Sequence, residues 1–171
     1  RPLVSRTWSS GTPKYPAGFA HYDYVNPDAP KGGTLNLGNP DRGTSFSTLN
    51  PYLLNTEYAY GTYFFSFETL CDPSEDEAGV MYGLVAEAML VAPDLSSVSF
   101  RINPRAHFTN GDPVTAADVK YSFDTQVSDQ ANPGIAATLA LASRAVVIDA
   151  RTIRFDLAVR SRDSVYTLGT F

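Results

Sequence analysis

The clearest pattern of apolar and polar positions lies between residues 94 and 124. Apolar residues occupy alternate positions over residues 98–102, which is the period of a strand with one buried face. Asn110-Gly111 follows, and this pair tolerates the positive φ of a tight turn. After Thr115 the apolar positions take a helical period, and Thr115 with Asp118 forms a capping signal. The stretch therefore predicts a strand, a turn and a capped helix.

Before this stretch the patterns are weaker. Alternation over residues 34–38 predicts a strand, entered through the turn pair Gly32-Gly33. Residues 57–70 predict a helix, and residues 82–91 fit either a strand or a helix. The core-facing side of the helix at 57–70 is expected to carry Tyr60, Phe64, Phe67 and Leu70.

After this stretch, Asn132-Pro133-Gly134 breaks the chain and residues 135–142 predict a short helix. Residues 146–157 predict a hairpin with its turn at 149–151, and Val146 and Ile148 are expected to share one face of it. Ser161 is a candidate N-cap for a final helix.

Residues 1–31 show no sustained period and are rich in Pro, Gly, Ser and Tyr. We expect them to form an extended arm that lies over a folded body and is anchored by its aromatic side chains. These anchors are Tyr15, Phe19, Tyr22 and Tyr24. Residues 32–171 are then expected to form a single domain.

Composition narrows the class of protein. The chain has 171 residues, of which 43% are hydrophobic and 18% are charged, so it is long enough for one core and globular in character. It shows no apolar run of membrane-spanning length, and its 13 basic residues are scattered against 18 acidic ones, which argues against a nucleic-acid surface. Its single cysteine, Cys71, excludes an internal disulfide and is expected to be buried.

The sequence carries no local catalytic motif, such as Gly-x-Ser-x-Gly or His-Glu-x-x-His, and no cofactor or metal site is expected. The residues alone leave two functions open. One is a hydrolase that uses carboxylates between Asp72 and Glu77, because an acid–base pair needs no fixed sequence spacing. The other is a protein-interaction domain with an exposed patch of Tyr58, Tyr60 and Tyr63.

Short motifs of a recognisable kind are spread along the chain: Lys31-Gly32-Gly33-Thr34-Leu35, Leu49-Asn50-Pro51, Glu68-Thr69-Leu70, Ala86-Glu87, Asp94, Phe100-Arg101-Ile102, Arg105-Ala106, Phe108, Gly111, Pro113-Val114-Thr115-Ala116 and Asp118-Val119. With these motifs, most of which lie in or near the stretch from 94 to 124, the chain resembles the extracellular solute-binding proteins of peptide ABC importers, family 5. The segment from Tyr24 to Gly33 is most similar to the Yej-type subgroup of oligopeptide binders.

The resemblance implies an α+β (mixed α/β) fold, namely the N-terminal part of a class II periplasmic-binding-protein clam-shell with a small sheet and packed helices. It implies that residues 32–171 hold the first strand of the large lobe plus the small inserted domain, and that a second ligand-binding lobe is absent from this chain. The implied function is capture of oligopeptides in the periplasm or at the cell surface for a membrane permease, without covalent chemistry. The implied ligand-binding residues are Asn55, Thr56, Glu57, Tyr58, Asn132, Pro133 and Gly134.

Overall fold

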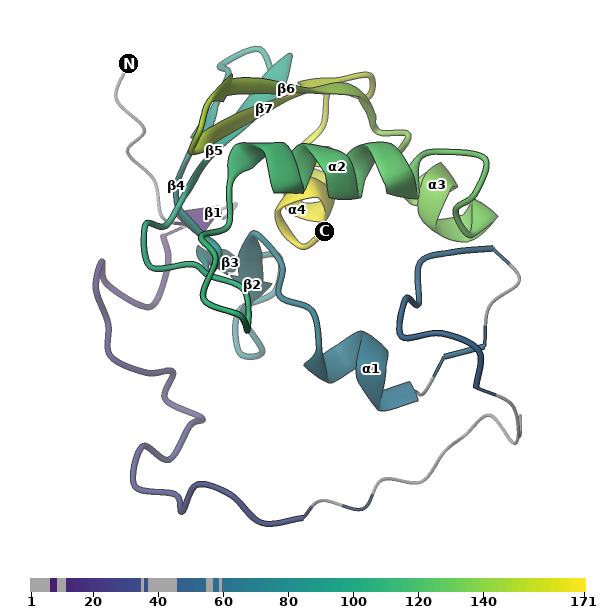
Figure 1. The fold of residues 1–171 in the computed structure, drawn as a ribbon. Coiled ribbons are helices and arrows are strands. Elements are labelled where there is room, and N and C mark those ends of the chain that lie inside the picture. Colours follow the sequence, from purple (N-terminus) through teal and green to yellow (C-terminus); the bar gives the residue numbers. More distant parts are fainter. Residues whose placement is uncertain (1–6, 9–11, 35, 37–45, 55–56, 59) are drawn as a thin grey trace.

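A four-stranded antiparallel sheet, covered on one face by helices, organises the chain (Figure 1). The structure is a computed structural model that describes residues 7–8, 12–34, 36, 46–54, 57–58 and 60–171. The strand order in the main sheet is β4-β5-β7-β6, and a second, small sheet has the order β1-β3-β2. The elements in chain order are β1 (Thr7–Trp8), α1 (Tyr60–Phe65), β2 (Cys71–Pro73), β3 (Met81–Gly83), β4 (Ala86–Val91), β5 (Ser97–Ile102), α2 (Ala116–Gln126), α3 (Pro133–Leu139), β6 (Ala142–Asp149), β7 (Thr152–Leu157) and α4 (Arg162–Gly169).

The predicted strand, turn and capped helix are confirmed. Alternate residues of β5 are fully buried, and Gly111 takes a φ of 91° in the turn that follows. Helix α2 starts at a complete capping box: the Thr115 side chain accepts from the Asp118 backbone N–H, and the Asp118 carboxylate accepts from the Thr115 N–H at 2.8 Å. Local sequence chemistry therefore sets the start of the helix that packs across the sheet.

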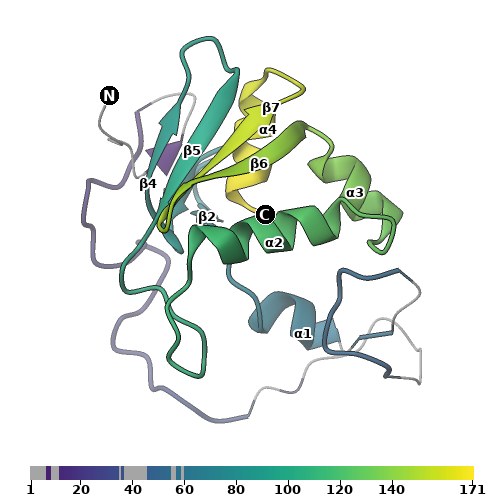
Figure 2. The ribbon, with the colours of Figure 1, turned by 45° about the horizontal axis from the view of Figure 1, so that its top comes forward.

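The core lies between the main sheet and helices α2 and α4. Its largest fully buried side chains include Phe100 and Phe155 from neighbouring strands. Their rings stand edge to face at 6.1 Å, and Phe123 of α2 contacts Phe155 at 5.3 Å. Figure 2 shows α2 and α4 on the same side of the sheet. Burial of these aromatic rings is what fixes the helices to the strands.

One prediction about local structure is wrong in part. The helix expected over residues 57–70 is only the six-residue α1, and Phe64 and Phe67 are 54% and 43% exposed rather than in the core.

The predicted hairpin is formed by β6 and β7. Ala145 of β6 pairs with the buried Phe155 and is itself buried, whereas Ile148 is 52% exposed.

Other predictions have simpler outcomes. Residues 82–91 are extended and contribute to β3 and β4, and Ser161 caps α4 by accepting from the Ser164 N–H at 3.0 Å. Cys71 is fully buried, as expected. The strand expected over residues 34–38 falls mostly on residues outside the described part of the chain.

The arm docks on the small sheet through aromatic packing, as predicted. Tyr15 is 7% exposed and forms a second apolar cluster with Val80 and Tyr82, against which Phe19 and Tyr22 pack. The ring of Tyr15 lies 4.9 Å from that of Phe19 and 5.7 Å from that of Tyr82. The described residues thus form two apolar clusters, one beneath the main sheet and one beneath the arm.

Candidate functional site

Four of the seven predicted ligand-binding residues belong to the segment that follows Leu54. Asn55 and Thr56 lie outside the described residues, whereas Glu57 and Tyr58 are described and both are exposed. The other three, Asn132, Pro133 and Gly134, start α3.

Hydrogen bonds join Glu57 to Ser47 and Thr48, ten and nine positions earlier in the chain. The Glu57 carbonyl accepts from the Ser47 N–H at 2.8 Å and from the Thr48 N–H at 3.3 Å. The Ser47 hydroxyl in turn accepts from the Glu57 N–H at 3.0 Å, and Thr48 forms an isolated bridge with Tyr58. Residues 46–54 are therefore part of a loop whose two ends are held together.

This loop is also tied to the turn between α2 and α3. The Leu54 N–H donates to the Gln130 carbonyl at 2.8 Å, and the Asn132 N–H donates to the Tyr52 carbonyl at 2.9 Å. Leu53 and Ala131 form the antiparallel bridge between these two bonds. The structure thus places residues 52–54, which precede one predicted segment, beside residues 130–132, where the other begins.

An aromatic cluster lies beside the tied loop. We define it as Tyr52, Tyr58, Tyr63, Phe64 and Phe67. The Tyr52 ring is 5.8 Å from that of Tyr63 and 5.2 Å from that of Phe67, while Tyr63 contacts Phe64 at 5.1 Å. Burial, with a smaller effect of Tyr63, raises the pKa of Tyr52 to about 12.

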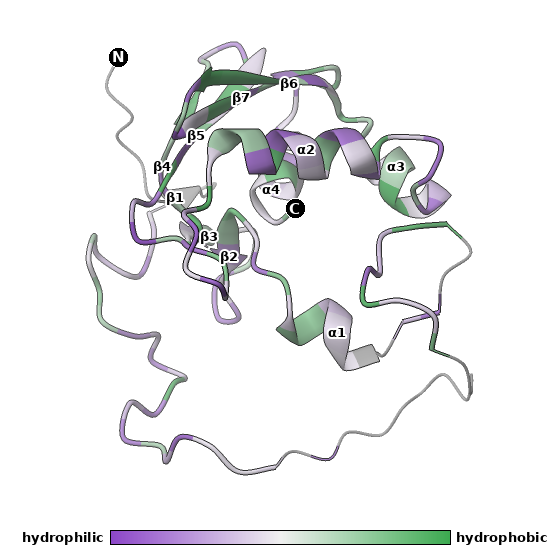
Figure 3. Ribbon diagram, in the orientation of Figure 1, coloured by the Kyte–Doolittle hydropathy of each residue, from purple (hydrophilic) through white to green (hydrophobic). Residues whose placement is uncertain are grey.

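Most of this cluster faces solvent. Tyr58, Tyr63, Phe64 and Phe67 are 39%, 41%, 54% and 43% exposed. Figure 3 shows apolar colouring on α1, which stands away from the main sheet. Exposed aromatic residues gathered in one place mark a surface for a ligand or another protein segment. Tyr58 and Tyr63 were expected on an exposed patch, whereas Phe64 and Phe67 were expected in the core. The run of aromatic residues beside an irregular loop was the sequence signal for the whole cluster.

The carboxylates considered for a hydrolase serve another purpose. Asp72 accepts from the Tyr22 hydroxyl at 3.1 Å, and Asp76 accepts from the Tyr15 hydroxyl at 2.7 Å. Lys14, followed by Tyr15, lowers the pKa of Asp76 to about 2. These carboxylates hold the arm on the small sheet, which gives the hydrolase alternative no support.

Glu77 completes this arrangement. It accepts from the Tyr82 hydroxyl at 2.6 Å and, through its other oxygen, from the backbone N–H of Lys14. Burial and then this bond raise the pKa of Tyr82 to about 12. Lys14 forms ion pairs with both Asp76 and Asp23, whose contacts raise the pKa of the lysine. We call the arm residues Lys14, Tyr15 and Tyr22, with Asp72, Asp76, Glu77 and Tyr82, the arm clasp.

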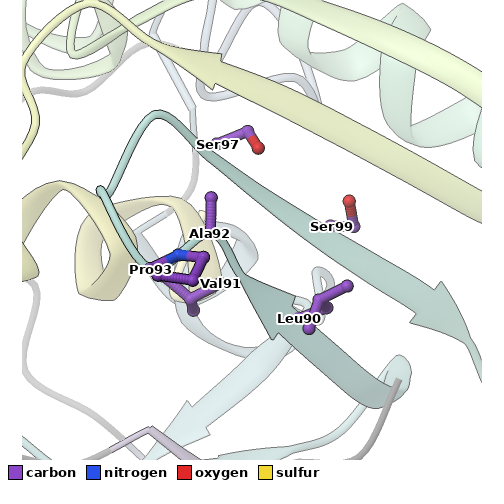
Figure 4. Close-up of a pocket in the computed structure, with 6 residues that line it drawn as sticks. All are labelled: Leu90, Val91, Ala92, Pro93, Ser97 and Ser99. Atoms are coloured by element: carbon purple, nitrogen blue, oxygen red, sulfur yellow. The ribbon is translucent and has the colours of Figure 1, made fainter. Parts of the chain in front are cut away.

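A surface depression of about 310 Å³ lies elsewhere, on the hairpin of β4 and β5 (Figure 4). Leu90, Val91, Ala92, Pro93, Ser97 and Ser99 line it. It contains none of the predicted ligand-binding residues and no ionisable side chain. This lining offers neither the chemistry nor the location expected for the site.

The described part of the chain gives no sign of a metal centre or a membrane span. Within it, no group of three or more His, Cys, Asp or Glu residues is placed to hold a metal ion. None of its helices has the length and apolar character needed to cross a membrane.

Comparison with known proteins identifies the family. A sequence profile of the bacterial extracellular solute-binding proteins, family 5 (Middle), matches residues 80–170. The uncharacterized protein y4wM of Sinorhizobium fredii is 50% identical over 111 residues, which are 65% of this chain and 16% of that protein. The probable peptide-binding protein YejA of Agrobacterium fabrum is 39% identical over 145 residues, which are 85% of this chain and 23% of that protein. The chain therefore spans about a fifth of the length of these relatives.

The fold is similar to that of a solved structure. NikZ of Campylobacter jejuni, in complex with Ni(L-His), superposes with a TM-score of 0.60 at 14% identity, over 74% of this chain and 25% of NikZ. The expected α+β fold, as part of a periplasmic-binding-protein architecture, is confirmed. On the profile match, which covers more than half of the chain, this protein belongs to the bacterial extracellular solute-binding proteins of family 5, as the resemblance had implied.

Proposed function

We propose that this chain supplies one wall of a peptide-binding site in the solute-binding component of an ABC importer. In this role the protein captures oligopeptides or peptide-like ligands in the periplasm and delivers them to a membrane permease. Family membership and the name of the Agrobacterium relative, a probable peptide-binding protein, support the ligand class.

The observation that carries the proposal is the exposed aromatic cluster beside the two tied segments. An extended peptide is held by main-chain hydrogen bonds, and aromatic side chains add contact area at low cost in conformational entropy. On this proposal Asn55, Thr56, Glu57 and Tyr58 line the peptide, with the start of α3 at Asn132, Pro133 and Gly134 beside them. The acidic residues of the arm clasp take no part.

Titration of the ¹⁵N-labelled chain with trialanine, followed by NMR, tests the proposal. We expect weak binding, with a dissociation constant of about 1 mM or higher, because one wall supplies only part of the contacts. Shifts should map to residues 46–58 and α1, and free alanine at the same concentration should produce none there. Tight binding by this chain alone would contradict the single-wall proposal.

A pair of variants locates the binding surface. Tyr63→Ala removes the ring that contacts Tyr52, Tyr58 and Phe64, so it should abolish most of the trialanine shifts. Tyr121→Ala is the matched control, because Tyr121 is a 73% exposed tyrosine on α2, outside the cluster. Equal effects of the two variants, or shifts confined to the depression at residues 90–99, would refute the assignment.

A further inference from the structure

Asn132 forms hydrogen bonds both within α3 and to the 46–54 segment, which lies far from it in the sequence. Its side-chain oxygen accepts from the Gly134 N–H at 2.9 Å and so caps α3. Its backbone N–H donates to the Tyr52 carbonyl at 2.9 Å and so holds the 46–54 segment. One residue therefore sets both the start of the helix and the position of the loop.

The local sequence explains why Asn132 can do both. A residue that precedes proline is kept out of the helical region, and Asn132 has φ −58° and ψ 126°. Pro133 at the first helical position needs no hydrogen-bond partner for its nitrogen. The N–H of Asn132 consequently points away from the helix and is available to the loop.

The Oδ1 atom of Asn132 has a structural use within α3. A Cβ built on Gly134 would lie 3.3 Å from the Asn132 Oδ1, so the glycine leaves just enough room for the cap. Because Oδ1 accepts from the Gly134 N–H, the side chain has a role that does not depend on a ligand.

The effect of Asn132 on the surface passes through Tyr52. The Tyr52 ring packs against Tyr63 and Phe67, at 5.8 and 5.2 Å, and Tyr52 is the least exposed member of the aromatic cluster. A shift of the 46–54 segment away from Asn132 would move this ring and disturb its two neighbours. We infer that Asn132 is a positioning residue, which holds the aromatic cluster in place through Tyr52 and tunes ligand affinity without touching the ligand; the statement on affinity rests on the proposed function.

Amide hydrogen exchange of the full 171-residue chain tests the positioning role without any ligand. Asn132→Ala removes the cap, and loss of an N-cap should raise the exchange rate of the Leu54 amide, which bonds to Gln130, by roughly 5- to 30-fold. Asn132→Asp retains the acceptor oxygen and should exchange at close to the wild-type rate. Ser161→Ala, which removes the equivalent cap of α4, is the matched control and should leave the Leu54 amide unchanged.

The ¹³Cζ signal of Tyr52 gives a second readout. In Asn132→Ala the pKa of Tyr52 should fall from about 12 toward its usual 10, since the ring gains water when the segment moves, whereas Ser161→Ala should not change it. An unchanged Leu54 amide and an unchanged Tyr52 pKa in Asn132→Ala would overturn the inference.

Trialanine titration separates positioning from direct contact. If Asn132→Asp reduced trialanine binding while the Leu54 amide kept its wild-type exchange rate, Asn132 would be a ligand contact and the inference would be wrong. If wild-type protein failed to bind trialanine at all, the proposed function would fail, while the exchange results would still decide whether Asn132 positions the cluster.

Discussion

Tyr15→Phe is expected to loosen the arm and leave the main sheet intact. The Tyr15 hydroxyl donates to Asp76 at 2.7 Å and accepts from the Asp23 N–H at 2.9 Å. The substitution removes both bonds and keeps the ring in its apolar cluster. The bond to the Asp23 amide is worth ~1 kcal/mol, which corresponds to roughly a fivefold larger open population of the arm. The bond to Asp76 adds less, because that carboxylate is solvated.

Amide hydrogen exchange is the assay for this prediction. The Phe19 and Val25 amides, which form turn hydrogen bonds within the arm, should exchange about five times faster in the variant. Amides of β5 and β7 should keep their wild-type rates, because their side chains belong to the other apolar cluster.

The control variant is Tyr24→Phe. The Tyr24 hydroxyl accepts from the Glu75 N–H at 3.5 Å, a long contact, and its ring is 46% exposed, so little change is expected. Equal acceleration in the arm and in β5 after Tyr15→Phe would show that the arm and sheet open as one unit and would refute the reasoning. If the arm amides did not exchange faster, the free energy assigned to the hydrogen bond of the Tyr15 hydroxyl would be wrong.

The remaining predictions concern acid, a helix cap, the buried thiol and a close helix contact. Asp76 has its pKa lowered to about 2 from 3.8, so its contribution to arm docking is complete above about pH 4 and is lost as the pH falls toward 2; arm exchange in Asp76→Asn should vary less over this range, and an identical pH profile would contradict this. Thr115→Ala should lower the free energy of unfolding in urea by ~1 kcal/mol through loss of the α2 cap, whereas Thr115→Ser should largely retain it. Cys71, whose pKa burial raises to about 12, should resist iodoacetamide at about pH 8 until urea unfolds the chain; rapid labelling of the native protein would contradict its burial. Gly169→Ala should lower the melting temperature, because the new Cβ would meet the buried Met81 Sδ and overpacking costs ~1–3 kcal/mol, more than the helix propensity gained; a higher melting temperature would show that Met81 moves aside freely.

Much of the scaffold was predictable because its signals are local. The alternation in β5, the Asn110-Gly111 turn and the Thr115 capping signal each involve residues within a few positions of one another. The pairing of β6 with β7 was not predictable in the same way. Register shifts near the two ends of β6 change which residues oppose β7, and nothing in the local alternation of apolar residues encodes them.

The candidate site was predictable only in outline. The resemblance pointed to the segments at 55–58 and 132–134, but the hydrogen bonds that bring Tyr52 and Asn132 together depend on packing across the whole domain. The apolar residues of α1 were assigned to the core because most aromatic residues at helical spacing lie there. Exposure of Phe64 and Phe67 reflects a helix of only six residues that stands away from the main sheet.

The tie between Tyr52 and Asn132 also has a consequence for the order of folding. It joins positions 80 residues apart (132 minus 52), and closing a chain segment of that length has an entropic cost that a pair of backbone hydrogen bonds offsets only in part. Folding of the sheet and α2 shortens the free segment between the two positions and so meets part of that cost. The tie should therefore form after the main sheet and open before it, so the 46–54 segment can leave and return to its place without refolding of the core.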